Sequence, residues 1–110
     1  MPAGRGRRIF LTGFSGTGKS HIGRLVARKL GWRFVDTDQM IVKATGRQIP
    51  EIFASDGEAA FRTLEKQALA EAAAMEDCVV STGGGVPTDP ENRRLMTEAG
   101  VVIRLVASPE

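Results

Sequence analysis

A glycine-rich segment near the amino terminus carries the strongest chemical signal in this sequence of 110 residues. The segment Gly13-Phe14-Ser15-Gly16-Thr17-Gly18-Lys19-Ser20 matches the phosphate-binding pattern G-x-x-x-x-G-K-[ST] without a mismatch. Glycines let the backbone wrap closely and direct successive N–H groups at a phosphate, and the helix that follows adds its positive amino-terminal end. Lys19 is therefore expected to bridge the β- and γ-phosphates of a nucleotide, and the Ser20 hydroxyl to ligate Mg²⁺.

Two carboxylates, Asp36 and Asp38, directly follow a short apolar stretch. Ligands bind beyond the carboxyl ends of strands in open α/β sheets, so these side chains should face the same crevice as the phosphate loop. One would hold Mg²⁺ through water, and the other would accept a proton from a substrate hydroxyl. The alternative is a structural role as the cap of a helix starting at Gln39, which Asp38 would also suit. The residue types alone favour neither interpretation.

Three further features have both a chemical and a structural interpretation. Arg62 lies three residues before Glu65, which suits either a surface ion pair or a guanidinium that Glu65 orients toward a substrate carboxylate. The triplet Gly83-Gly84-Gly85 follows an apolar stretch and favours close approach of the backbone to a ligand over a tight turn alone. His21, the one histidine, is expected on a helix surface.

Alternating strands and helices are expected to position these residues. Apolar runs predict strands at 9–11, 32–35, 78–82 and 101–106. Helices are predicted over 19–30, 39–45, 50–54 and 57–75, followed by one that ends at Gly100. This alternation predicts a single α/β domain built on a parallel sheet.

The same patterns make more specific predictions about burial. On the first helix, apolar residues recur at helical spacing and are expected to face the core: Ile22, Leu25, Val26 and Leu30. The strand at 101–106 is largely apolar, which is typical of a strand buried on both faces. Residues 1–8 hold three arginines and two glycines and are expected to form a flexible basic terminus ahead of a domain at 9–110.

Composition excludes several classes of protein. The 15 Lys and Arg against 13 Asp and Glu give a net charge of +2, too small to argue for a nucleic-acid partner. No apolar run is long enough to span a membrane, and no signal peptide is expected ahead of the domain. Cys78 is the one cysteine and cannot form an internal disulfide, which fits a reducing compartment, so we expect a cytoplasmic protein. We also expect the protein to act as a monomer on small molecules.

Taken together, these motifs resemble those of shikimate kinase, a small P-loop kinase of the nucleoside-monophosphate-kinase type. Many NTPases share the phosphate loop, but the further motifs in this order are far more selective, and their spacing agrees from about Arg8 to Val106. The matching segments are Gly13–Ser20, Phe34–Asp38, Ile49–Phe53, Gly57–Arg62 with Glu65, and Ser81–Gly85.

The resemblance implies a three-layer α/β/α P-loop kinase domain that phosphorylates the 3-hydroxyl of shikimate with ATP and Mg²⁺. The product, 3-phosphoshikimate, belongs to chorismate and aromatic amino-acid biosynthesis. The nucleotide phosphates would contact the loop and the start of its helix, namely Gly16, Thr17, Gly18, Lys19, Ser20 and His21. Ser20 would also ligate Mg²⁺, and Asp36 would support the water shell of the metal.

The resemblance also implies where the acceptor would bind. Asp38 would hydrogen-bond the shikimate hydroxyls and is the candidate catalytic base, whereas Arg62 would bind the carboxylate. The glycine triplet, Gly83 to Gly85, would border the substrate, with Gly84 against the ring. Lys19 and Asp38 are thus the expected catalytic residues.

The end of the chain departs from the family pattern. Members of the family continue through a mobile lid with an arginine that reaches ATP, then a second substrate-binding arginine, a last strand and an adenine-contacting loop. Ser108-Pro109-Glu110 is typical of a helix start, after which the sequence stops. We therefore expect a domain truncated at its carboxyl terminus, with an uncovered apolar sheet edge and low turnover as it stands.

Two alternatives remain open at this point. One is a related small-molecule kinase, such as a gluconate kinase, against which Arg62 and the glycine triplet argue. The other is a truncated nucleotide-binding module with little turnover, against which the intact Lys19, Ser20 and Asp38 argue.

Overall fold

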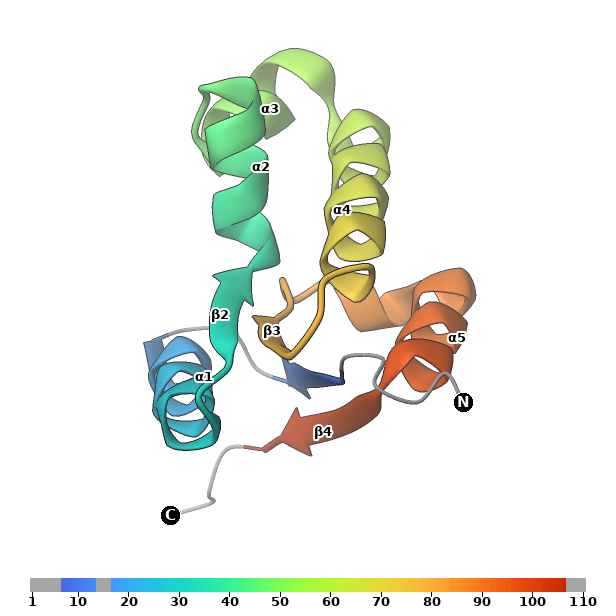
Figure 1. Cartoon of the computed structure of the whole chain (residues 1–110). Helices are drawn as coiled ribbons and strands as arrows, with labels where there is room; N and C mark the ends of the chain where they lie inside the picture. The colour runs from blue at the N-terminus through green and yellow to red at the C-terminus, as the bar shows by residue number, and fades with distance from the viewer. Residues whose placement is uncertain (1–6, 14–16, 107–110) are drawn as a thin grey trace.

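The computed structural model describes residues 7–13 and 17–106, and Figure 1 shows how their elements are arranged. The strands are β1 (Arg8–Gly13), β2 (Arg33–Asp36), β3 (Cys78–Ser81) and β4 (Val101–Leu105). The helices are α1 (Thr17–Leu30), α2 (Thr37–Thr45), α3 (Ile49–Asp56), α4 (Glu58–Ala73) and α5 (Pro90–Ala99), with a short 3₁₀ turn, η1 (Val86–Thr88). The four strands pair in parallel in the order β2-β3-β1-β4, which confirms the predicted α/β class.

Helices cover both faces of this sheet, and the core has a separate part on each side. On one face, Leu11 and Val79 pack with Ala27 of α1. On the other, Phe10 and Val80 pack with residues of α4 and α5. A third cluster joins α2 and α3 to α4: Ile41, Ile52, Phe61 and Ala68. In Figure 1, α2 and α3 extend beyond the sheet, where both pack against α4.

The face that α1 turns toward the sheet differs from the prediction. Ile22, Leu25 and Leu30 are exposed, so the predicted apolar stripe is wrong except at Val26. Gly23 and Ala27 occupy the buried face instead, because a Cβ on Gly23 would lie only 2.5 Å from Cε1 of Phe34. Small residues let α1 lie close against β2, which leaves the longer aliphatic side chains outside.

Strand β4 is an edge strand, and it too differs from its prediction. It pairs with β1 alone within the described residues, and its Val101, Val102 and Ile103 are 40–58% exposed. The prediction of burial on both faces is therefore wrong. The expectation of an uncovered apolar sheet edge is confirmed.

Hydrogen bonds hold the first described residues, Arg7 and Arg8, against the rest of the fold. Arg8 is the first residue of β1, and its side chain donates to the backbone oxygens of Ala99 (2.9 Å) and Met75 (2.6 Å). The N–H of Arg7 donates to Oδ1 of Asp77 at 3.1 Å. These bonds join the start of the sheet to the residues that follow α4 and to the end of α5.

Several predictions fall outside the described residues: the flexible terminus over residues 1–6, the phosphate loop over 14–16, and the helix start at 108–110. Within 7–13 and 17–106, no helix has the length and apolar character needed to cross a bilayer. Predicted helix ends differ from the observed ones by up to two residues, as is usual at element boundaries.

Candidate active site

The predicted site residues lie where three parallel strands end at the same edge of the sheet. Gly13 ends β1, Asp36 ends β2 and Ser81 ends β3, with Leu11 and Asp36 both in register with Ser81. Gly13 has a φ of +119°, and any Cβ there would overlap the backbone oxygen of Leu105. Only glycine lets the chain leave β1 this close to β4, so this residue fixes where the phosphate loop begins.

Lys19 lies at the amino-terminal end of α1 with its side chain turned inward. It is only 3% exposed, and its Nζ donates to the backbone oxygen of Gly13 at 3.4 Å. Burial lowers the pKa of the Lys19 ammonium, while the nearby negative charges of Asp36 and Asp38 act in the opposite direction. A cation held between the loop and two carboxylates suits the predicted role of contacting phosphate oxygens.

The other predicted nucleotide contacts are less fully defined. Gly18 and His21 are exposed on the first turns of α1, which agrees with the surface position expected for His21. Gly16 and the side chain of Thr17 lie outside the described part of the structure.

Asp36 has the capping role that the sequence suggested for Asp38. Its Oδ1 accepts from the backbone N–H groups of Asp38 (2.9 Å) and Gln39 (3.2 Å), so Asp36, and not Asp38, caps α2. Its Oδ2 accepts from Oγ of Ser20 at 3.2 Å. The strand runs directly into the helix, which puts the cap at the last strand residue and leaves Asp38 inside the first turn.

The Ser20 and Asp36 oxygens fit the predicted magnesium site. Two ligands on adjacent corners of a Mg²⁺ octahedron lie roughly 3 Å apart, which is close to the separation of Oγ and Oδ2. Over residues 7–13 and 17–106 there is no cluster of three or more His, Cys, Asp or Glu side chains able to hold a metal. Mg²⁺ commonly uses one or two protein carboxylates together with substrate phosphates and water, so this donor set suits it.

Asp38 presents a buried carboxylate oxygen that lacks a donor. Its Oδ1 is inaccessible to solvent and has no hydrogen-bond partner among the described residues. The oxygen lies against the glycine turn, where a Cβ on Gly83 would approach it to 2.6 Å. A buried acceptor without a donor costs about 1–3 kcal/mol. Such an atom is suited to receive a hydrogen bond from a bound ligand.

The surroundings of Asp38 also alter its acidity. Burial raises the pKa of the Asp38 carboxyl, and the negative charges of Asp36 and Glu65 raise it further. Lys19 and Arg62 act in the opposite direction but do not cancel the effect. A carboxylate with a raised pKa is a better proton acceptor, which agrees with the predicted role as a base.

Arg62 combines the two arrangements predicted for it. Its Nη1 donates to Oε1 of Glu65 at 2.7 Å, and its Nη2 lies 3.2 Å from Oε2 of the exposed Glu58. The hydrogen bond to Glu65 is the main cause of a raised pKa for Arg62. Glu65 is 2% exposed and Arg62 is 40% exposed, so a buried carboxylate holds Nη1 of a guanidinium that is itself only partly exposed.

The structure explains the presence of glycine at two positions of the triplet in a way that the sequence did not suggest. A Cβ on Gly83 would meet Oδ1 of Asp38 and lie 3.1 Å from Oε2 of Glu65, and one on Gly85 would overlap Nη1 of Arg62. Neither glycine has a positive φ, so space and not backbone conformation excludes a side chain. The observed close approach is therefore to the site's own charged groups, whereas approach to a ligand stays a prediction.

Two threonine hydroxyls position the glycine turn and were missed from the sequence. Oγ1 of the fully buried Thr37 accepts from the N–H of Gly83 at 2.9 Å, and Oγ1 of Thr82 donates to the backbone oxygen of Leu11 at 2.9 Å. The turn is thereby joined both to α2 and to β1. The sequence did offer one indication for Thr37, because this residue lies between the two aspartates that were predicted to belong to the site.

Replacing Thr37 with valine should release the turn locally. The N–H of Gly83 would lose its acceptor in a buried position, so we expect faster hydrogen exchange of this amide. Serine keeps the hydroxyl and should keep the protection. Exchange measured by NMR on both variants checks this, and equal protection in Thr37→Val and Thr37→Ser would contradict the positioning role.

Comparison with known proteins agrees with this geometry. The model of the shikimate kinase family matches residues 15–110. The shikimate kinase of Geobacter metallireducens is 53% identical over 104 residues, which are 94% of this chain and 58% of that protein. The chain thus spans somewhat more than half the length of the curated relatives it matches.

Solved structures give the same result. A shikimate kinase from Acinetobacter baumannii, in complex with shikimate, superposes with a TM-score of 0.89 at 39% identity, over 94% of this chain and 57% of that chain. The enzyme from Aquifex aeolicus superposes with a TM-score of 0.87 at 39% identity, over 93% of this chain and 60% of that chain. Since the family model matches well over half of the chain and these folds coincide, the chain belongs to the shikimate kinase family.

Proposed function

We propose that the protein transfers the γ-phosphoryl group of ATP to the 3-hydroxyl of shikimate. The observation that carries this proposal is the buried Oδ1 of Asp38, which lacks a donor within the described residues. A substrate hydroxyl bound there would supply the missing hydrogen bond. The Asp38 carboxyl also lies close enough to Lys19 and Arg62 for both positive charges to act on its pKa, so the proposed phosphate-binding and carboxylate-binding cations are both near it.

The acceptor has functional groups that these residues complement. Shikimate carries a ring carboxylate and hydroxyl groups, and the relative from Acinetobacter baumannii was solved with it bound. Arg62 offers the donors that Glu65 and Glu58 leave unused, and its fork suits the paired oxygens of a carboxylate. Asp38 and Arg62 both lie against the glycine turn, Asp38 beside Gly83 and Arg62 beside Gly85.

The reaction needs little from the protein beyond position and charge. The 3-hydroxyl oxygen forms a bond to the γ-phosphorus as the bond to the bridging oxygen of ADP breaks, and the hydroxyl proton passes to Asp38. Lys19 offsets negative charge on the phosphate oxygens. Ser20 and Asp36 would hold Mg²⁺, which supplies further positive charge at the nucleotide phosphates.

We further propose that the protein acts as a monomer in the cytoplasm, on these small molecules and without nucleic acid or membrane partners. The single cysteine, Cys78, is fully buried in the sheet, and burial raises the pKa of its thiol. A buried, protonated thiol suits a reducing compartment.

Release of ADP tests the proposed reaction. We expect ADP, at the low turnover predicted for this chain, when the protein receives ATP, Mg²⁺ and shikimate, and none when gluconate replaces shikimate. The Geobacter metallireducens relative serves as the positive control for the assay. Calorimetric titration of shikimate onto the protein adds a readout that does not require turnover. Release with gluconate but not with shikimate would favour a gluconate kinase and overturn the assignment.

A further inference from the structure

The glycine triplet runs directly into the short turn η1, whose closing backbone hydrogen bonds are long. The N–H of Thr88 donates to the oxygen of Gly85 at 3.2 Å. The N–H of Asp89 donates to the oxygen of Val86 at 3.4 Å, which is beyond the usual range for such a bond. Pro87, in the middle of the turn, has no N–H to donate. The turn therefore depends on side chains for part of its support.

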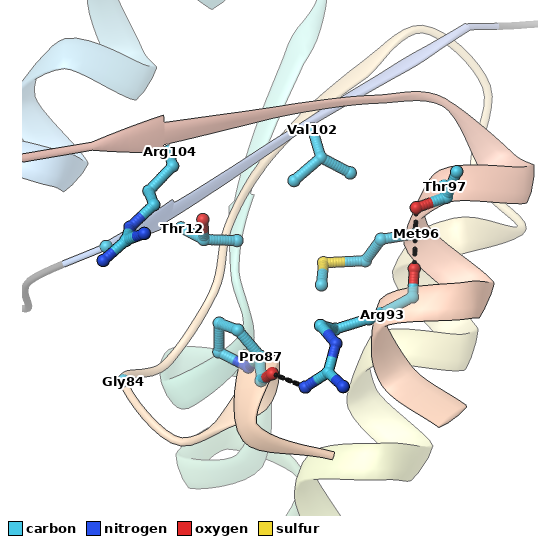
Figure 2. A pocket seen from close by; sticks show the side chains of 9 residues that line it. Thr12, Gly84, Pro87, Arg93, Met96, Thr97, Val102 and Arg104 are labelled. Carbon is cyan, nitrogen blue, oxygen red and sulfur yellow. Dashed lines mark hydrogen bonds between the residues drawn. The ribbon is translucent and has the colours of Figure 1, made fainter. Parts of the chain in front are cut away.

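Two consecutive residues of α5 bind two consecutive carbonyls of this turn. Nδ2 of Asn92 donates to the backbone oxygen of Val86 at 3.1 Å. Nη1 of Arg93 donates to the backbone oxygen of Pro87 at 2.6 Å, and Figure 2 shows this guanidinium reaching the turn from α5. The bond from Asn92 is buried, whereas the bond from Arg93 is exposed. Water can therefore replace the second bond but not the first.

Packing alone does not explain an asparagine at position 92. Asn92 is only 4% exposed, and its Oδ1 has no hydrogen-bond donor among the described residues. A buried acceptor without a donor lowers stability, a penalty that an apolar side chain would not carry. What the amide adds is the Nδ2 donor at the carbonyl of Val86. This bond points to a role in placing the turn.

The turn borders the proposed acceptor site. The N–H of Val86 donates to the oxygen of Gly83 at 3.1 Å, which joins the turn to the start of the triplet. Oγ1 of Thr88 donates to the oxygen of Gly85 at 2.6 Å, which joins it to the end. A Cβ on Gly85 would lie 2.0 Å from Nη1 of Arg62, so the backbone here directly borders this guanidinium. Displacing η1 would therefore displace Gly85 and change the space beside Arg62.

We propose that Asn92 is a positioning residue for the acceptor site. By binding the carbonyl of Val86 it fixes η1, and η1 fixes the backbone of Gly85 beside the guanidinium of Arg62. Thr37 holds the triplet at its first residue, as described above, and Asn92 holds it beyond its last. The consequence for shikimate rests on the proposed function, whereas the hold on the turn does not.

Asn92→Leu tests the hold on the turn by NMR without any substrate. The amides of Val86 and Thr88 should exchange about threefold to tenfold faster, the equivalent of one neutral hydrogen bond, and the Nε–Hε resonance of Arg62 should shift. The urea midpoint should change little, because the variant removes the unpaired Oδ1 together with the donor. Asn92→Ala adds no bulk and should accelerate exchange in the same way, so it decides the test if the leucine variant does not fold.

Leu95→Ala is the matched control on α5. It loosens the packing of this helix on the core but removes no hydrogen bond to the turn, so it should lower the urea midpoint and leave the Arg62 resonance in place. Unchanged exchange of Val86 in the Asn92 variants, or an equal shift of the Arg62 resonance in Leu95→Ala, would overturn the proposal.

Calorimetric titration tests the consequence for the acceptor. Asn92→Leu should weaken shikimate binding about threefold to tenfold and leave the binding of ATP with Mg²⁺ unchanged. Arg93→Ala should weaken shikimate binding less than about twofold, because water replaces its exposed bond. Equal losses of affinity for both ligands, or unchanged shikimate affinity despite faster exchange, would overturn the positioning role. If the unaltered protein binds no shikimate, the proposed function is wrong, and exchange and the Arg62 resonance still decide whether Asn92 places the turn.

Discussion

Replacing Asp38 with asparagine is expected to lower the rate of shikimate-dependent ADP release by about 10²–10⁴-fold, the usual contribution of a positioned general base. Asparagine has nearly the same shape, and its carbonyl oxygen can still accept a hydrogen bond, but the amide cannot take up the hydroxyl proton. Affinity for shikimate should fall much less than the rate. A variant that keeps more than a tenth of the rate would show that Asp38 only positions the hydroxyl.

The same substitution should stabilise the fold at neutral pH. Because the pKa of Asp38 is raised in the folded protein, the charged carboxylate opposes folding above that pKa, and the penalty disappears as the pH falls through it. The neutral amide carries no such penalty, so the gain from Asp38→Asn should be largest at neutral pH and shrink on acidification toward the ordinary aspartate pKa of about 3.9. Urea unfolding at several pH values measures this.

Asp56 offers a matched control for this experiment. It is an exposed aspartate whose pKa is lowered by Arg47, so its charged form favours folding. Asp56→Asn should leave ADP release unchanged and should not stabilise the protein at neutral pH. The same substitution is therefore expected to change the free energy of unfolding in opposite directions at the two aspartates. Equal effects of the two substitutions on stability would contradict the burial argument for Asp38.

Replacing Arg62 with alanine should raise the KM for shikimate by roughly 10- to 100-fold, the equivalent of about 1.5–3 kcal/mol for hydrogen bonds to a charged group. The KM for ATP should change little, because Arg62 lies on α4, whereas the predicted nucleotide contacts belong to the phosphate loop and the start of α1. Steady-state kinetics with each substrate varied in turn measures the two effects. Equal increases in both constants would rule out a role confined to the acceptor carboxylate.

The partner of Arg62 complicates this variant, and a second one resolves the difficulty. Alanine at position 62 leaves the buried Glu65 carboxylate without its guanidinium, which is expected to lower the free energy of unfolding. Arg62→Lys keeps a positive charge near Glu65 but loses the planar fork. If the fork binds the carboxylate, lysine should recover stability more fully than it recovers the KM for shikimate.

Much of this site was predictable because the glycine-rich loop requires a strand before it and a helix after it. That requirement, with the alternation of later strands and helices, indicated a parallel sheet whose strand ends bring Lys19, Asp36 and Asp38 together. The periodicity of a sequence does not determine which of two adjacent stripes on a helix faces the core. On α1 the answer depended on the space above Phe34, which admits Gly23 but no larger residue.

Roles that depend on geometry at junctions were harder to predict. Whether Asp36 or Asp38 caps α2 is decided by the residue at which the extended backbone turns helical, and a spacing of two does not determine that residue. The hydroxyl of Thr37 and the burial of Glu65 depend on contacts across the fold that no local pattern records. In each case the sequence shows the residue type but not the residue that it contacts in the folded protein.

The crowding around Gly83 and Gly85 has a consequence for how this site can evolve. Every other encoded amino acid carries a Cβ, so each point substitution at these codons pushes against Asp38 or Arg62. Single substitutions in this turn are therefore expected to disturb the site and not to change its shape gradually. New acceptor specificities would have to arise from residues outside this turn, where a side chain can be exchanged without meeting Asp38 or Arg62.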